Sequence, residues 1–82
     1  MFKNCTSLQS IDLSNITSIG YGAFKGCTAL SNVTWPSSDF IINGSIDNGA
    51  FKNCTSLTSV DLTNCTSVGV EAFMGCTNLG LN

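Results

Sequence analysis

A recurring phenylalanine, cysteine and leucine pattern constrains this chain more than any other feature. Residues 50–62 read AFKNCTSLTSVDL, and residues 2–13 repeat this stretch almost unchanged as FKNCTSLQSIDL. Phe24 follows Phe2 by 22 residues, Phe51 follows Phe24 by 27, and Phe73 follows Phe51 by 22. The cysteines and leucines of the pattern keep the same gaps. A motif at a fixed period indicates a solenoid, in which each unit buries its apolar face against its neighbours.

Each unit continues into an alternating apolar stretch, for which Leu8, Ile11 and Leu13 set the pattern. Its last part has a period of two residues, which predicts a short strand with one buried face. The Gly-x-x-Ala-Phe segments at 20–24 and 69–73 are too short for an independent helix. We expect each to form a single helical or 3₁₀ turn on the outer side. A unit of 22 residues falls within the leucine-rich-repeat range of roughly 20–29.

The segment over 19–36 reads I-G-x-x-A-F-x-x-C-x-x-L-x-x-V-x-W-P. It resembles the BspA-type (treponemal-type) leucine-rich repeat, whose unit reads I-G-x-x-A-F-x-x-C-x-x-L-x-x-V-x-L-P, and the resemblance covers essentially the whole chain. We therefore predict an α/β leucine-rich-repeat solenoid of about three and a half right-handed coils, with a short parallel β-sheet on the concave face. The resemblance implies a non-enzymatic interaction role, typically adhesion at a cell surface through protein or glycan ligands, and an extracellular location.

The repeats predict one domain over 1–82, with units at about 1–22, 23–49, 50–71 and a partial unit at 72–82. The second unit is longer than the others. We place its extra residues in 37–45, because the pattern returns Ile46 to the position of Ile19 and Val68. This insertion predicts a short extra strand or an apolar bulge, and it is a candidate interaction surface. Its apolar residues are Phe40, Ile41 and Ile42.

Residues at the same repeat position are expected to stack in columns, with a polar face alongside. The core columns consist of Phe2, Phe24, Phe51 and Phe73, of Cys5, Cys27, Cys54 and Cys76, and of Leu8, Leu30, Leu57 and Leu79. The candidate polar binding face consists of Ser10, Asp12, Ser14, Asn32, Thr34, Ser59, Asp61 and Thr63. The concave face of a solenoid is its usual binding surface. Trp35 falls at an inward position, which favours a core role.

The sequence offers little for metal, cofactor or catalytic chemistry. It has no histidine and no Cys-x-x-Cys pair, so we expect no zinc site. Stacked cysteines lie within disulfide reach, but their parallel side chains suit the disulfide torsion poorly. We expect buried free thiols, with some disulfide as the alternative. Asp12 and Asp61 should lie roughly 10 Å apart, too far to share one calcium ion. Without a catalytic constellation or phosphate loop, we expect neither an enzyme nor a cofactor.

Charge and hydropathy exclude some classes of binding partner. A net charge of −2 with 3 basic residues disfavours nucleic acid. No apolar run approaches the roughly 18–20 residues of a membrane span, and no signal peptide is recognisable. The sequence begins and ends in mid-repeat. Two functions remain open: a surface interaction module that binds a protein or glycan, and a self-assembling unit whose uncapped ends pair with other copies.

Overall fold

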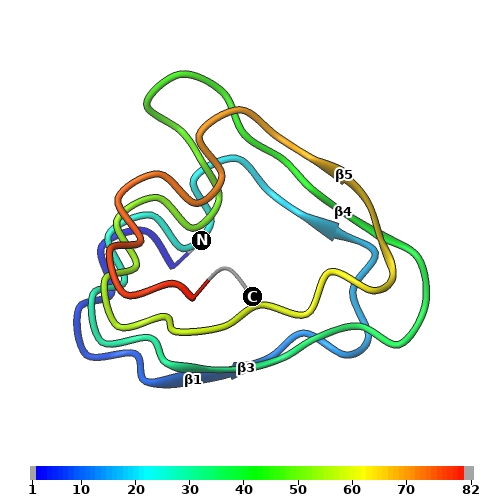
Figure 1. Ribbon diagram of the computed structural model, residues 1–82, viewed down its shortest axis with the longest axis horizontal. Helices are drawn as coiled ribbons and strands as arrows, with labels where there is room; N and C mark the ends of the chain where they lie inside the picture. Colours follow the sequence, from blue (N-terminus) through cyan, green and yellow to red (C-terminus); the bar gives the residue numbers. More distant parts are fainter. Residues whose placement is uncertain (1, 81–82) are drawn as a thin grey trace.

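The structure of the protein is a computed structural model, and residues 2–80 are described. The chain winds into coils that overlie one another when viewed down the shortest axis (Figure 1). Its strands are β1 (Ser10–Asp12), β2 (Ser18–Ile19), β3 (Asn32–Thr34), β4 (Phe40–Ile42) and β5 (Cys65–Val68). They form two parallel sheets, one with the order β1-β3 and one with the order β2-β4-β5.

The α/β part of the predicted fold class finds no support, because residues 2–80 contain strands and turns but no helix. The segments at 20–24 and 69–73, expected to be helical or 3₁₀, are hydrogen-bonded turns. Gly22 and Glu71 have φ values of 63° and 59°, and such left-handed residues interrupt a right-handed helix. The first two coils also form strands on two sides rather than one, and with β5 of the third coil this gives the second sheet. The handedness and the concave curvature stay predictions.

One position of every unit takes a left-handed backbone conformation, and it is always asparagine or glycine. Asn4, Gly26, Asn53 and Gly75 have φ values of 60°, 77°, 65° and 79°. Both residue types tolerate this region better than others. A Cβ atom on Gly26 would come within 2.2 Å of Asn4 Oδ1, and one on Gly75 within 2.1 Å of Asn53 Oδ1. The alternation of asparagine and glycine therefore lets each asparagine side chain lie over the glycine of the next coil.

The phenylalanines form a stacked column through the molecule. Ring centroids are 5.5 Å apart for Phe2 and Phe24, 5.2 Å for Phe24 and Phe51, and 5.4 Å for Phe51 and Phe73. Their planes lie within 10° of parallel. Phe24 and Phe51 are buried, whereas the outer two rings are half-buried against the core. The leucine column follows the same rule: Leu30 and Leu57 are buried, and Leu8 and Leu79 are half-buried.

The cysteine column is hydrogen-bonded as well as buried. The thiols of Cys27, Cys54 and Cys76 donate to the phenylalanine carbonyl of the preceding coil at 3.0–3.1 Å. Cys5, in the first coil, is half-buried against the same core. A small apolar side chain with a weak donor suits a position that packs tightly and faces a carbonyl oxygen. All five cysteines of the chain are free thiols.

The predicted equivalence of Ile46 with Ile19 and Val68 is wrong, and the insertion predicted at 37–45 only overlaps the observed one. Strand β4 pairs Ile42 with Ile19 on one side and with Val68 on the other, so Ile42 rather than Ile46 holds the equivalent position. Phe40 and Ile42 are each 1 % exposed, whereas Ile46 is 74 % exposed. Most of the extra length thus follows β4, in the loop over 43–48 that projects from the coils in Figure 1. Burying two large apolar side chains is worth about 1.5–3 kcal/mol each, which favours this register over one that buries Ile46.

Polar contacts tie the projecting loop back to the coils. Lys52 Nζ lies 3.2 Å from Asp47 Oδ1 and 2.9 Å from Glu71 Oε1. The backbone N–H of Asp47 donates to the same Glu71 oxygen at 3.1 Å. Lys25 Nζ donates to the Asp47 carbonyl. The hydrogen bonds from Lys52 and from Asp47 hold the pKa of the Glu71 carboxyl below its ordinary value.

Candidate functional site: a groove where the coils separate

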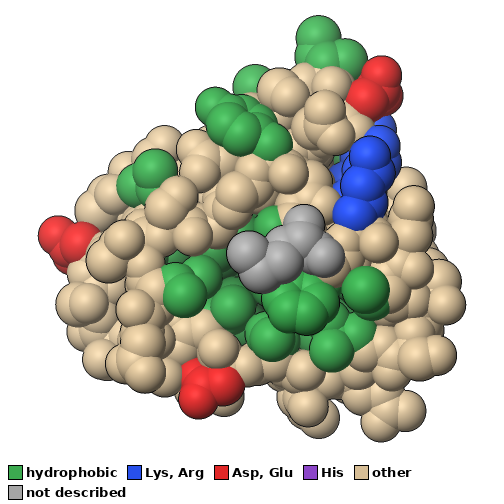
Figure 2. Space-filling model, turned by 180° about the vertical axis from the view of Figure 1, so that it is seen from behind, with side chains coloured by type: hydrophobic (Ala, Val, Ile, Leu, Met, Phe, Trp, Pro, Cys, Tyr) green, Lys and Arg blue, Asp and Glu red, His purple; other side chains and the backbone are tan. Residues whose placement is uncertain are grey.

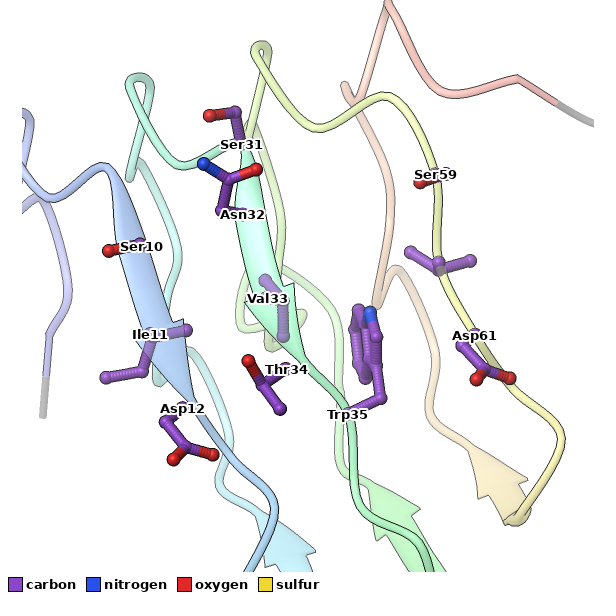
Figure 3. A pocket seen from close by; sticks show the side chains of 11 residues that line it. Ser10, Ile11, Asp12, Ser31, Asn32, Val33, Thr34, Trp35, Ser59 and Asp61 are labelled. Atoms are coloured by element: carbon purple, nitrogen blue, oxygen red, sulfur yellow. The ribbon is translucent and has the colours of Figure 1, made fainter.

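An open groove of about 670 Å³ crosses β1, β3 and the extended segment over 58–62 (Figure 3). This volume lies within the roughly 300–1,000 Å³ typical of ligand pockets. The predicted polar residues that line it are Ser10, Asp12, Asn32, Thr34, Ser59 and Asp61. The structure therefore brings together most of the predicted polar face. Ser14 and Thr63 lie in the turns immediately after the groove and do not line it.

Strand alternation places this polar row on the surface. In β1 and in β3 the outer two residues are exposed and the central one is half-buried. The register pairs Ser10 with Asn32 and Asp12 with Thr34, so polar side chains of the two coils lie beside one another. The half-buried Ile11 and Val33 pair between them, and both also line the groove. The polar side chains thus lie on the exposed face of the strands and the apolar ones on the opposite, core-facing side, and both kinds line the groove.

The groove lies where the backbone ladder between the second and third coils is missing. Between the first and second coils, the Ser31 N–H donates to the Gln9 carbonyl at 3.0 Å. At the equivalent position between the third coil and the partial fourth one, the Gly80 N–H donates to the Thr58 carbonyl at 2.9 Å. Between 29–37 and 55–63, both within the described chain, no backbone hydrogen bond forms. The same two coils are joined elsewhere, at Phe24 N–H to the Ala50 carbonyl (2.7 Å) and between β4 and β5. The gap is therefore local.

Trp35 explains the gap. It holds the repeat position of Leu13 and Leu62, and its ring centroid lies 5.5 Å from that of Phe51. Figure 3 shows the indole standing between β3 and the segment that carries Ser59 and Asp61. Leu13 is 5 % exposed, whereas Leu62 is 37 % exposed. We attribute this difference to the indole, which is larger than a leucine side chain and occupies space between the two coils.

The role predicted for Trp35 was thus incomplete. Its ring packs on the core, with centroids 5.5 Å from Phe51 and 6.2 Å from Phe40, and it is half-buried. It also lines the groove. Sequence reasoning missed this groove role, as it missed that of the half-buried Val33 and Val60. The available signal was the replacement of the family's Leu-Pro pair by Trp35-Pro36.

Two carboxylates give the groove its charge, and the turns that follow them hold each in place. Asp12 Oδ1 accepts the Ser14 N–H at 2.9 Å. Asp61 Oδ1 accepts the Thr63 N–H at 3.0 Å and the Thr63 hydroxyl at 2.6 Å. Hydrogen bonds from the Ser14 and Thr63 side chains, and then from their backbone N–H groups, lower the pKa of each carboxyl. Both carboxylates are therefore ionised at neutral pH, and the lining includes no lysine.

The apolar residues of the insertion that were predicted to form an interaction surface, Phe40, Ile41 and Ile42, do not line this groove. They form β4, the central strand of the other sheet, and the side chains of Phe40 and Ile42 point into the core. Ile41 alone of the three reaches the surface. A central strand pairs on both sides, and the alternation of its side chains here leaves one residue outward. The prediction that Phe40 and Ile42 form an interaction surface is therefore wrong.

The remaining titratable groups form no site. Within residues 2–80, no three His, Cys, Asp or Glu side chains come together as metal ligands would. Burial raises the pKa of the Cys54 thiol to about 12, so this sulfur stays protonated and is a poor nucleophile. Burial also raises the pKa of Cys27 and Cys76. No helix in the described part of the chain is long and apolar enough to span a membrane.

Comparison with known families matches the BspA type leucine-rich repeat region, in 6 copies, to residues 1–80. The chain belongs to this family, and the resemblance drawn from the repeat is confirmed. Searches of curated proteins and of solved structures found no match. Membership suggests a protein-interaction repeat module from a family that is generally non-enzymatic.

Proposed function

We propose that this chain is a non-enzymatic interaction module of the surface-adhesion type, which binds a protein or glycan through the groove across β1, β3 and 58–62. The observation that carries the proposal is the local loss of the backbone ladder between the second and third coils. It leaves a groove lined by exposed polar side chains and by the half-buried Trp35. Tryptophan is enriched where proteins bind partners, because it combines a large apolar surface with a polar N–H.

The supporting coils favour a preformed site. Ile11, Val33 and Val60 of the segments that flank the groove pack against the buried core, and Trp35 contacts Phe51 of the phenylalanine column directly. The carboxylates are oriented by hydrogen bonds from their own turns rather than by flexible side chains from elsewhere. A ligand that binds such a site loses less free energy to ordering the protein than one that must organise a loop.

The test compares a groove variant with a matched surface variant. Thr34→Arg places a long side chain in the middle of the groove, and Ser67→Arg places the same side chain on β5, in the other sheet. Both positions are exposed strand positions, and neither side chain makes a hydrogen bond in the structure. Each protein is passed over a panel of purified extracellular-matrix proteins and arrayed glycans, and binding is followed by surface plasmon resonance.

We expect the parent chain and Ser67→Arg to bind the same panel member and Thr34→Arg to lose that binding. A panel without any bound member, or equal binding by Thr34→Arg, would count against the proposal. Circular dichroism of both variants checks that the fold is retained.

A second candidate function is self-assembly into stacked copies. Figure 2 shows apolar side chains gathered over the centre of one face of the molecule. Val68, Val70 and Met74 are exposed on the last coils, and β5 pairs on one side only. An unpaired strand beside exposed apolar side chains invites pairing with another chain. Sedimentation equilibrium tests this alternative: a monomer at high micromolar concentration excludes it, whereas association that Val70→Glu abolishes favours it.

A further inference from the structure

The groove also indicates the chemical class of its partner. We propose that it binds an extended peptide segment rich in lysine or arginine, which adds as a strand along the free edge of β3. This inference rests on the proposed function, because it uses the same groove. It goes further by choosing a peptide over a glycan and a basic segment over a neutral or acidic one.

The backbone groups of β3 leave one edge of this strand free. The Asn32 N–H donates to the Gln9 carbonyl at 3.2 Å, and the Thr34 carbonyl accepts the Leu13 N–H at 2.8 Å. Both bonds run towards the first coil. Alternate residues of a parallel strand direct their backbone groups to opposite sides, so the N–H and C=O of Val33 face the groove. No hydrogen bond reaches them from 55–63, although all these residues are described. Such an edge is a template for an added strand.

Polar and apolar side chains alternate along each strand that lines the groove, the polar ones exposed and the apolar ones facing the core. Ile11, Val33 and Val60 form a half-buried apolar row, and Trp35 stands beside it. The flanking residues are exposed polar side chains. In strand addition, backbone hydrogen bonds provide affinity, and the positions between them select alternate side chains of the peptide. A peptide strand with alternating apolar and polar residues matches both features. A sugar could stack on the indole, but it lacks the regular amide spacing that a strand edge pairs with.

The charge of the groove favours a basic partner. Asp12 and Asp61 lie on opposite sides of the groove towards the same end, with Thr34 and Trp35 between them (Figure 3). Both ion pairs in the described chain involve Lys52, so neither groove carboxylate is paired with a cation. The turns fix both carboxylates through Oδ1 and keep them ionised. A lysine or arginine side chain on the added strand would meet one or both charges.

The chain supplies its own reporter for the test. Trp35 is the single tryptophan of the sequence, and it lines the groove, so its fluorescence emission reports occupancy. The probes are a short peptide of alternating lysine and valine and its counterpart of alternating glutamate and valine. Two further lysine–valine peptides carry N-methyl groups on alternate residues, one on the odd positions and one on the even positions.

We expect the lysine–valine peptide to change Trp35 emission saturably, and the glutamate–valine peptide to bind at least about tenfold more weakly. One N-methylated peptide should lose about tenfold or more in affinity while the other binds nearly as before, because a strand presents alternate N–H groups to one neighbour only. Replacing both groove acids, as Asp12→Asn with Asp61→Asn, should weaken the lysine peptide about tenfold and flatten its dependence on salt. Asp39→Asn, at an exposed position outside the groove, is the matched control. It should change neither the affinity for the lysine peptide nor the salt dependence of that affinity.

The outcomes separate this inference from the proposed function. Equal binding of the two N-methylated peptides would overturn strand addition, and equal binding of the lysine and glutamate peptides would overturn the basic partner. If no peptide changes Trp35 emission while Thr34→Arg still abolishes binding to a panel member, the peptide inference falls and the proposed function stands. A glycan that binds the groove when every peptide fails likewise overturns the peptide inference alone. If no peptide binds and every panel member binds Thr34→Arg as it binds the parent chain, both the peptide inference and the proposed function are overturned.

Discussion

Replacing Leu57 by alanine tests whether the stacked columns stabilise the fold. Leu57 is 0 % exposed and lies in the column between the buried Leu30 and the half-buried Leu79. Leucine-to-alanine substitutions in a closed core cost about 2–5 kcal/mol, and this site has coils on both sides that limit its collapse. A chain of 82 residues has a free energy of unfolding of about 4–12 kcal/mol at the usual 0.05–0.15 kcal/mol per residue. Leu57→Ala should therefore remove a large share of the free energy of unfolding.

Leu79→Ala is the matched comparison, because it makes the same chemical change at the same repeat position. Leu79 is half-buried, so part of its side chain already contacts solvent and the expected loss is about 1–2 kcal/mol. Urea unfolding followed by Trp35 fluorescence measures both variants. With a slope of about 1 kcal/mol/M, typical of a small protein, Leu57→Ala should lower the midpoint by about 2 M or more and Leu79→Ala by about 1–2 M.

Comparable midpoints for the two variants would refute the reasoning, because they would mean that the central coil is no better packed than the outer one. If Leu57→Ala fails to fold, Leu57→Val supplies the comparison with a smaller loss. An unchanged slope is required in either case, since a changed slope would mean that the unfolded or native state had altered in compactness.

Single positions outside the leucine column give three more predictions. Gly26→Ala should destabilise the protein by about 1–2 kcal/mol because of its left-handed backbone and the nearby Asn4 side chain, whereas Gly20→Ala, which meets nothing within 4 Å, should be close to neutral in thermal unfolding. The pKa of Glu71 is lower in the folded protein than in the unfolded chain, so its contribution to stability is complete above the unfolded pKa and disappears as pH falls through the folded pKa. Glu71→Gln should therefore flatten the decline of the unfolding midpoint below about pH 4. An acid-unfolding profile that the substitution leaves unaltered would disprove this role. The thiol of Cys54, whose pKa burial raises to about 12, should resist alkylation in the native protein and react after denaturation; native labelling as fast as for an unfolded peptide would contradict its burial.

The repeat allowed the family and the polar row to be predicted from sequence. The phenylalanine spacing fixes which residues are equivalent, and the unit defined in this way resembles the motif of the family that the comparison confirmed. Alternation around Ile11 and Val33 is local, so Ser10 and Asp12 could be placed outward without coordinates. These inferences depend on positions within one unit or on the period between units.

The register of the second unit could not be predicted in this way. Either Ile42 or Ile46 could continue the column of Ile19, and the sequence pattern favoured Ile46. The choice depends on how many large side chains the complete core buries, and the structure buries Phe40 and Ile42 and leaves Ile46 in a projecting loop. Burial is a property of neighbouring coils, which a single unit does not specify.

The sequence by itself determined the period of the coil, the identity of the stacked columns and the polar row beside the strands, because each depends on short-range spacing. The tertiary structure alone decided where the ladder opens. An indole at a position that normally holds leucine can either pack inside its coil or stand between two coils, and only the surrounding packing selects between these outcomes. Trp35 stands between β3 and the segment over 58–62, against the Phe51 ring, and the groove exists for that reason.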